Sequence, residues 1–315
     1  MALFLVTGGG GFIGSNLVET ILGAGDSVRV LDDFSTGRRR NLLDAAEWAR
    51  RGGGSFALVE ADIRDLDACR AATSGADFVL HQAAMPSVPR SIEDPLGSNG
   101  VNVGGTLNLL VAARDARVRR FVYASSSSLY GESDVLPKVE TMAPAPISPY
   151  GLQKLAGETY CALFHRLYGL PTVALRYFNV FGPRQNPDSE YAAVVPRFMQ
   201  AIREGNRPVV FGDGEQTRDF TYVRNAVRAN LLACDSGERS LGQAFNVACG
   251  ARISLNRLIE LIAALAGRPV TARYDPPRAG DIRDSLADIA KARDLLGFEP
   301  EVGVKDGLRL LWESG

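Results

Sequence analysis

The chain has 315 residues, of which 46% are hydrophobic and 23% are charged, so it holds enough apolar material for two domains or for one α/β domain with a large appendage. The 35 Lys and Arg residues nearly balance the 36 Asp and Glu residues, and the net charge of −1 implies neither a nucleic-acid partner nor a membrane surface. Four scattered cysteines and two histidines argue against a metal site and favour reduced thiols. No apolar run reaches the ~20 residues of a membrane span, and the first expected strand begins too near Met1 for a signal peptide, which predicts a cytoplasmic protein.

The first half of the chain alternates short apolar runs with helical patterns. Buried strands are expected at residues 3–6, 28–31, 56–59, 78–80, 121–123 and 172–175, and helices at 15–24, 101–116 and 150–167. Strands that are apolar on both faces and separated by helices indicate a parallel sheet covered on both sides. The pattern therefore predicts an α/β fold with a Rossmann-type, doubly wound parallel sheet.

The pattern changes after about Phe181, where prolines and glycines become frequent and strands become short. Clear helical patterns return only at residues 255–265 and 289–296. We therefore divide the chain into a Rossmann domain (1–180) and a smaller mixed α/β lobe for the substrate (181–315). This boundary is soft, because segments near 220–250, such as 245–247, could return to the main sheet.

A glycine-rich turn follows the first expected strand, with Gly8, Gly11 and Gly14 spaced three apart and Phe12 and Ile13 between the last two. Glycine suits a tight turn, the close approach of backbone to a pyrophosphate, and the packing of a helix on a strand. The N-terminus of the following helix favours phosphate, because its N–H groups are free and its dipole is positive there. The turn therefore predicts a dinucleotide site.

A carboxylate marks the ribose end of this site. Asp32 ends the second expected strand, eighteen residues after Gly14, and can accept hydrogen bonds from both ribose hydroxyls. This favours NAD over NADP, although the three arginines at 38–40 keep NADP open. Asp62 and Ile63, after the third expected strand, are predicted beside the adenine.

Tyr150 and Lys154 stand four residues apart, so a helix presents both side chains on one face. A phenol with a pKa of about 10 is a poor base, but a nearby ammonium and the positive nicotinamide ring of an oxidised cofactor favour the phenolate. Tyr150 is therefore a candidate general base. The serines at 125–128 end the preceding strand at the edge where ligands bind in such sheets, and one of them could share a proton with Tyr150.

Further motifs extend over residues 7–288: TGGGGFIGS, LDD, HQAA, N-x-x-G-T, ASSSSLYG, SPYGLQK, LRYFNVFGPRQ, FGDG, TRDF and PRAGDIRDSLAD. In these motifs the sequence resembles the extended short-chain dehydrogenases/reductases of the nucleotide-sugar epimerase/dehydratase family, and most of all their UDP-N-acetylglucosamine and UDP-glucose 4-epimerases. The resemblance implies Tyr150, Ser126 and Lys154 as catalytic residues. It implies that NAD contacts the glycine turn, Asp32, Asp33, Ser35, Thr36, Gly37, Asp62, Ile63, Gln82, Ala83, Ala84, Asn102, Ser125, Tyr150, Lys154 and Tyr177. His81 is expected to be a buried histidine near the nicotinamide.

The same resemblance implies a UDP-sugar site. Its expected residues are Ser87, Ser126, Ser127, Ser128, Tyr150, Asn179, Ala193, Val194, Phe211, Arg218, Arg278 and Ser285. Asn179 and the two arginines would contact the diphosphate, for which a bidentate guanidinium is well suited. Ser285 stands where epimerases confined to UDP-galactose and UDP-glucose can carry a bulky tyrosine, so we expect room for an N-acetyl group.

The serine run separates the activities of this family. The 4,6-dehydratases resemble one another in an acidic residue there, and the decarboxylases that make UDP-xylose usually carry a glutamate; residues 126–130 hold no carboxylate. We therefore expect reversible C4 epimerisation with tightly bound NAD, of UDP-GlcNAc/UDP-GalNAc and also of UDP-Glc/UDP-Gal. UDP-glucuronate 4-epimerase is the alternative, although that group has a threonine where Asn179 stands, and a non-catalytic NAD(P)-binding sensor is a remote one. A homodimer is implied as well, with the helices at 101–116 and 150–167 of each subunit forming a four-helix bundle.

Overall fold

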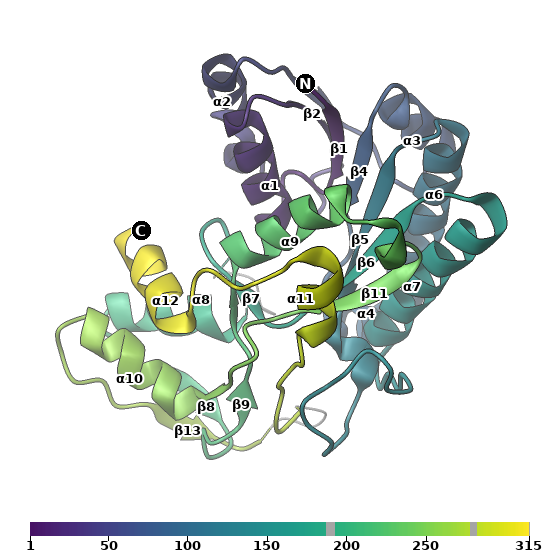
Figure 1. Cartoon of the computed structure of the whole chain (residues 1–315). Coiled ribbons are helices and arrows are strands. Elements are labelled where there is room, and N and C mark those ends of the chain that lie inside the picture. The colour runs from purple at the N-terminus through teal and green to yellow at the C-terminus, as the bar shows by residue number, and fades with distance from the viewer. Residues whose placement is uncertain (187–192, 278–281, 315) are drawn as a thin grey trace.

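The structure, a computed structural model, describes residues 1–186, 193–277 and 282–314 (Figure 1). Its centre is a seven-stranded sheet with the order β11-β6-β5-β4-β1-β2-β3, in which every pair of neighbours is parallel. The strands are β1 (Leu3–Thr7), β2 (Ser27–Leu31), β3 (Phe56–Val59), β4 (Phe78–His81), β5 (Arg120–Ser126), β6 (Thr172–Tyr177) and β11 (Gln243–Val247). The predicted doubly wound parallel sheet is confirmed.

The strand order reverses between β1 and β4, because the chain first builds outward through β2 and β3 and then crosses back. Side chains at the carboxyl ends of both strands therefore border a crevice at this switch point, where sheets of this kind bind ligands. One expectation about the sheet is wrong in detail. β3 was predicted to be buried, but Leu58 is 41% exposed because β3 is the edge strand.

Helices cover both faces of the sheet (Figure 1). On one face lie α1 (Phe12–Gly23), α2 (Ala45–Gly52) and α9 (Val223–Asp235), and on the other α3 (Leu66–Thr73), α6 (Thr106–Asp115) and α7 (Pro149–Tyr168). Alternate residues of each strand feed the two cores: in β1, Phe4 and Val6 join the first and Leu5 the second. Both faces therefore exclude water, which explains the continuous apolar runs in the sequence.

The expected helix at 101–116 is more irregular than its pattern suggests. It is preceded by α4 (Val88–Glu93) and α5 (Pro95–Asn99), and it opens with a π-helical turn, η2 (Gly100–Gly105), before α6 begins. The expected helix at 150–167 is α7. Ser148 caps its start, since Oγ accepts the Gly151 N–H at 3.1 Å, and Gly169 ends it with a φ of 69°.

The second half of the chain contributes pairs of short strands and more helices. The pairs are β7 (Val180–Phe181) with β10 (Thr221–Tyr222), β9 (Thr217–Arg218) with β12 (Ile253–Ser254), and β8 (Val209–Phe211) with β13 (Arg273–Asp275). The helices are α8 (Val194–Arg203), α10 (Leu255–Leu265), α11 (Ala290–Leu296) and α12 (Val304–Glu313). Short 3-10 turns occur in both halves of the chain: η1 (Arg39–Leu42), η3 (Ser127–Tyr130) and η4 (Glu238–Ser240). The patterns at 255–265 and 289–296 correspond to α10 and α11, whereas α8, α9 and α12 were not anticipated.

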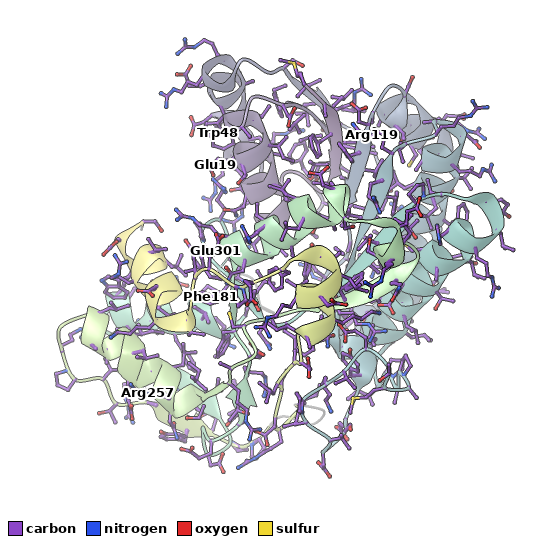
Figure 2. The ribbon with its side chains drawn as sticks, in the orientation of Figure 1. Glu19, Trp48, Arg119, Phe181, Arg257 and Glu301 are labelled. Atoms are coloured by element: carbon purple, nitrogen blue, oxygen red, sulfur yellow. The ribbon has the colours of Figure 1, made fainter. Side chains whose placement is uncertain are left out.

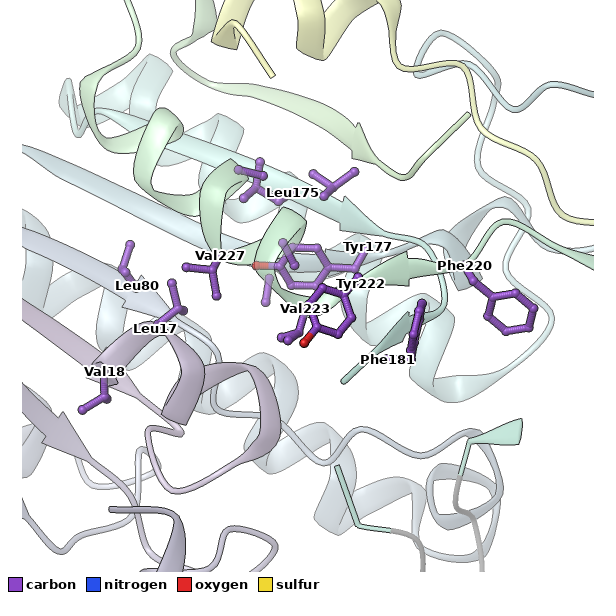
Figure 3. Packing of buried hydrophobic residues seen from close by; sticks show 14 of the residues in the cluster. Leu17, Val18, Leu80, Leu175, Tyr177, Phe181, Phe220, Tyr222, Val223 and Val227 are labelled. Carbon is purple, nitrogen blue, oxygen red and sulfur yellow. The ribbon is translucent and has the colours of Figure 1, made fainter. Parts of the chain in front are cut away.

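The chain returns to the main sheet after β10. Strand β11 pairs with β6 and extends the sheet by one strand, and α9 packs beneath β5 and β6. Figure 3 shows the core that results, in which Val223 and Val227 of α9 lie near Leu175 and Tyr177 of β6. The second half of the chain is thereby tied to the sheet that forms the crevice. None of the helices in the described ranges has the length and apolar character needed to cross a membrane.

Candidate active site

A cleft of about 520 Å³ lies at the switch point of the sheet, within the size range of cofactor sites. It is lined by every residue predicted to contact the dinucleotide except Asn102. It is also lined by Ser87 and Ala193 from the predicted substrate site. Residues at or just after the ends of six strands, β1 to β6, and residues of α7 therefore meet in one space, although they are up to 185 positions apart in the sequence.

The glycine turn forms a cradle with no room for side chains at two positions. Gly8 has a φ of +67°, and a Cβ there would lie 2.7 Å from the backbone N of Ala83. A Cβ on Gly14 would lie 2.1 Å from the carbonyl oxygen of Gly8. Helix α1 begins directly after Gly11 with no side-chain cap, so its first N–H groups remain available to an anion. This cradle fits the pyrophosphate of a dinucleotide.

Asp32 holds the turn together and borders the cleft. Its Oδ2 accepts the Gly10 N–H at 2.8 Å and its Oδ1 accepts the Phe34 N–H at 2.8 Å. Burial raises the pKa of Asp32, and the two backbone hydrogen bonds oppose that rise. Each carboxylate oxygen keeps a lone pair for a ribose hydroxyl. Arg39 pairs with Glu60 on the surface, outside the residues that line the cleft.

Tyr150 and Lys154 lie together at the opposite end of the cleft. The Lys154 ammonium is buried, donates to the carbonyl oxygen of Ala124 at 2.8 Å, and lies 5.9 Å from the centre of the Tyr150 ring. Burial lowers the pKa of Lys154 to about 8. Burial also raises the pKa of Tyr150, whereas the hydrogen bond of its hydroxyl to Ser126 lowers it. The two groups therefore occupy the positions that a base and its cationic neighbour require.

The serines at the end of β5 differ in what they contact. Ser126 bonds to Tyr150, and its Oγ also accepts Ser128 Oγ–H at 2.9 Å. Ser125 lines the cleft, but its hydroxyl donates to Glu158 at 2.7 Å. Of the candidates for a proton relay, Ser126 is thus the serine in contact with the tyrosine.

Beneath these serines lies a buried ion pair that the sequence analysis missed. Arg176 of β6 donates from Nη2 to Glu158 of α7 at 2.6 Å and from Nη1 to the Tyr130 hydroxyl at 2.7 Å. The Tyr130 hydroxyl in turn donates to Asn246 of β11 at 2.7 Å. The one available signal was an arginine within the apolar strand at 172–177 and a glutamate one turn after Lys154. This network fixes α7 to strands β6 and β11, close to the ends of the strands that line the cleft.

His81 is a neutral, structural histidine. It is 1% exposed, its Nδ1 lies 2.7 Å from Thr7 Oγ1, and its Nε2 lies 2.9 Å from Thr106 Oγ1. Thr106 donates its only proton to the Asn102 carbonyl oxygen, so Nε2 must be the protonated nitrogen and Nδ1 the acceptor. Burial lowers the pKa of His81 to about 3. The expectation of a buried histidine is confirmed.

Asn102 lies behind the residues that line the cleft, and its contact with NAD stays a prediction. Its Oδ1 accepts the Met85 N–H at 2.8 Å, and its Nδ2 donates to Gln153 Oε1 at 2.8 Å. It therefore connects the loop after β4 to α7. The cause is its position in the buried π-helical turn, where its side chain is 2% exposed.

The predicted substrate residues do not gather in a single cavity. Phe211 lines a second cavity together with Gln216, Asp275 and Arg283, whereas the following residues line neither of the two cavities: Ser126, Ser127, Ser128, Asn179, Val194, Arg218 and Ser285. The Asn179 amide donates to the Asp219 carbonyl oxygen at 3.2 Å, and the Ser285 N–H donates to the Thr217 carbonyl oxygen at 3.1 Å. Arg278 lies outside the described residues.

Several residues of the cleft were absent from the prediction, among them Arg90 of α4 and Arg184 after β7. Arg184 donates to Glu19 at 2.6 Å, and its guanidinium lies 5.7 Å from the centre of the Trp48 ring. Figure 2 shows Glu19 and Trp48 near each other on α1 and α2. The segment after β7 is thereby joined to the helix that carries the glycine cradle.

Known proteins share this arrangement. The model of the NAD dependent epimerase/dehydratase family matches residues 4–248. A UDP-glucose 4-epimerase of Mycolicibacterium smegmatis is 41% identical over 306 residues, which cover 96% of this chain and 95% of that protein.

Two solved structures are similar over nearly their whole length. A UDP-N-acetylglucosamine 4-epimerase from Methanobrevibacter ruminantium M1, in complex with UDP-N-acetylmuramic acid, has a TM-score of 0.92 and 39% identity, with 99% of this chain and 97% of that chain covered. A UDP-glucuronic acid 4-epimerase from Bacillus cereus, in complex with UDP-glucuronic acid and NAD, has a TM-score of 0.89 and 32% identity, with 99% and 98% covered.

Proposed function

Since the chain belongs to the NAD-dependent epimerase/dehydratase family, we propose that it catalyses the reversible C4 epimerisation of a UDP-hexose. The cofactor is NAD, and the chain's own residues fit it: the side-chain-free cradle at Gly8 and Gly14 suits the pyrophosphate, and Asp32 suits the ribose. The observation that carries the proposal is the position of Tyr150 in the cleft, with the buried ammonium of Lys154 5.9 Å from the centre of its ring.

Each of these residues has a distinct part in the proposed reaction. Bound NAD would supply the redox chemistry, that is, oxidation of C4 to a flat 4-keto sugar and its reduction from the other face. Tyr150 takes the proton of the C4 hydroxyl as its general base, and Ser126 orients the phenol and relays the proton. Lys154 supplies positive charge next to the phenol, and its bond to the Ala124 carbonyl oxygen holds that charge in place.

The shape of the serine run favours epimerisation over elimination of water. Residues 126–130 turn away from β5 as η3 and carry no carboxylic acid that could protonate a leaving hydroxyl. The carboxylate closest in the network is Glu158, but both of its oxygens are bound to Arg176. A dehydratase needs a free acid at this point to protonate the departing hydroxyl. Because residues 126–130 offer none, the 4-keto sugar would not lose water and would be reduced again.

We infer that the substrates are UDP-GlcNAc/UDP-GalNAc and also UDP-Glc/UDP-Gal. The support is Ser285, a small side chain next to Thr217, and the likeness to a UDP-N-acetylglucosamine 4-epimerase. The likeness to a UDP-glucuronic acid 4-epimerase, together with Arg90 and Arg184 in the cleft, supports UDP-glucuronate as the alternative substrate.

We also propose a homodimer through a four-helix bundle. The two helices would be α6 and α7. Leu152 and Leu167 are exposed apolar side chains on α7, and Ile92 of α4 and Leu96 of α5 are exposed on the segment that leads into α6. A second copy of the chain would remove them from water. Light scattering of the wild type and of Leu152→Glu tests this: a dimer that becomes a monomer supports it, and a monomeric wild type refutes it.

The function is tested by incubating the purified protein with UDP-GalNAc, UDP-Gal and UDP-GlcUA separately, without added NAD, and resolving the products by proton NMR. Conversion of UDP-GalNAc to an equilibrium with UDP-GlcNAc supports the proposal and the role of Ser285. Turnover of UDP-Gal alone contradicts the size argument, and turnover of UDP-GlcUA alone assigns the alternative. If nothing is converted even with NAD supplied, the nucleotide base or the reaction class of the proposal is wrong.

A further inference from the structure

Three polar side chains from three separate elements form a closed hydrogen-bonded ring beneath the cleft. They are Gln82, directly after β4, Tyr177 at the end of β6, and Asn230 on α9. The Tyr177 hydroxyl donates to Gln82 Oε1 at 3.3 Å, Gln82 Nε2 donates to Asn230 Oδ1 at 3.0 Å, and Asn230 Nδ2 donates to the Tyr177 hydroxyl at 2.7 Å. Gln82 and Tyr177 line the cleft, whereas Asn230 does not and is fully buried.

One backbone carbonyl sets the direction of the whole ring. Asn230 Nδ2 also donates to the carbonyl oxygen of Ala226 at 2.7 Å, and only the nitrogen of the amide can make that bond. The Asn230 oxygen must therefore face Gln82, whose nitrogen must face Asn230. Gln82 is then left with its oxygen toward Tyr177. A reversed amide at any point would bring two donors or two acceptors together.

On the side away from the cleft, the ring packs against the apolar core. Tyr177 belongs to the apolar core that includes Leu175, Val223 and Val227 (Figure 3). Burial raises the pKa of Tyr177 to about 12, so its proton stays on the phenol and in the ring. Tyr177 is thereby kept neutral and fixed in the ring.

We propose that Asn230 is a positioning residue that holds Gln82 and Tyr177 in the floor of the cofactor cleft, and that it thereby sets the affinity for NAD without touching the cofactor. Gln82 and Tyr177 come from strands on opposite sides of β5, and a side chain of α9 is what joins them. This inference concerns the cofactor site only and holds whichever UDP-sugar is the substrate.

The test compares Asn230→Leu with Asn225→Leu, a matched control on the same helix. Asn225 is 1% exposed and makes four hydrogen bonds, to the backbone of Glu301 and Val302 and to Cys249 Sγ, and it does not line the cleft. Both variants lose a buried amide, so both are expected to lower the melting temperature. Only Asn230→Leu is expected to lose NAD, with a Kd raised about tenfold, the effect of one hydrogen bond's net contribution.

Two readouts separate positioning from mere stability. Bound NAD is measured by chromatography of the denatured protein after gel filtration, and the Kd by titration of nucleotide-free protein at a temperature where each variant is folded. Asn230→Leu and Tyr177→Phe should be non-additive in the Kd, because each breaks the same ring. If Asn230→Leu does not fold, Asn230→Asp carries the test, because it keeps the volume but loses the donor to Tyr177. Wild-type NAD affinity in a folded Asn230 variant, or additivity with Tyr177→Phe, would overturn the proposal.

Discussion

Replacing Lys154 by methionine should stabilise the protein at neutral pH, where the buried ammonium is charged. The substitution also removes a residue of the proposed mechanism. The pKa of Lys154 falls from 10.5 to about 8 on burial, and at 1.36 kcal/mol per pKa unit the folded state loses about 3 kcal/mol at pH 7 by keeping the ammonium charged. Methionine fills a similar volume without charge. It leaves the Ala124 carbonyl oxygen without this donor, which costs about 1–2 kcal/mol and reduces the net gain.

The pH dependence of the unfolding free energy separates the effect of the Lys154 charge from the effect of the lost hydrogen bond to Ala124. Between pH 8 and 10.5 the unfolded chain holds a proton on Lys154 that the folded chain has released, so the stability of the wild type rises with pH relative to Lys154→Met. From pH 7 to 9.5 the difference in unfolding free energy should shift by about 2 kcal/mol in favour of the wild type. Urea denaturation of nucleotide-free protein at both pH values measures this shift, and Lys154→Met should show no epimerase turnover. Parallel pH profiles for the two proteins would refute the burial argument.

Three further predictions concern packing and buried charge. Gly14→Ala should destabilise the protein and abolish NAD binding, because its Cβ would lie 2.1 Å from a carbonyl oxygen, whereas Gly23→Ala in the same helix meets nothing within 4 Å and should be neutral or stabilising in thermal denaturation. Arg176→Met should cost about 3–5 kcal/mol by leaving Glu158 charged and unpaired, and adding Glu158→Leu should recover much of that loss in denaturant titrations. Because the folded pKa of His81 is about 3, stability should fall as the pH drops below about 6.5, by about 2 kcal/mol between pH 7 and 5, and His81→Asn should lack this component.

The sheet and the cofactor half of the cleft were predictable, because both depend on local sequence. Apolar runs bounded by turns located the strands, and a glycine triplet between a strand and a helix has few other uses. The ends of parallel strands meet at one edge, so residues such as Asp32 and Ser125 could be expected in the same crevice. The edge position of β3 was not predictable from its run of apolar residues, since Leu58 has the same pattern as a buried strand residue.

The supporting contacts could not be predicted in this way. Asn230 and Arg176 act through partners more than fifteen positions distant, and their value depends on how α9 and α7 pack on the sheet. In sequence, Asn230 is only a polar residue in an apolar stretch, which also describes a solvent-facing position. The same limit explains Asn102: the motif placed it near the cofactor, but the π-helical turn directs its amide to Met85 and Gln153.

The state of Tyr150 shows why the proposed base depends on more than its lysine. From the sequence alone, the Lys154 ammonium is expected to lower the pKa of the phenol, but burial raises the pKa of Tyr150, and the opposing contribution comes from Ser126. The ammonium faces the ring of Tyr150, and its own pKa of about 8 leaves it only partly charged in alkaline solution. A buried phenol ionises only when positive charge is added close to it. We therefore expect the Tyr150 phenol to keep its proton while it has only protein neighbours, and to act as the proposed base only with the positive ring of oxidised NAD beside it. On this proposal, Tyr150 would abstract the proton only in the complex with oxidised NAD, which is also the form that can take up the hydride.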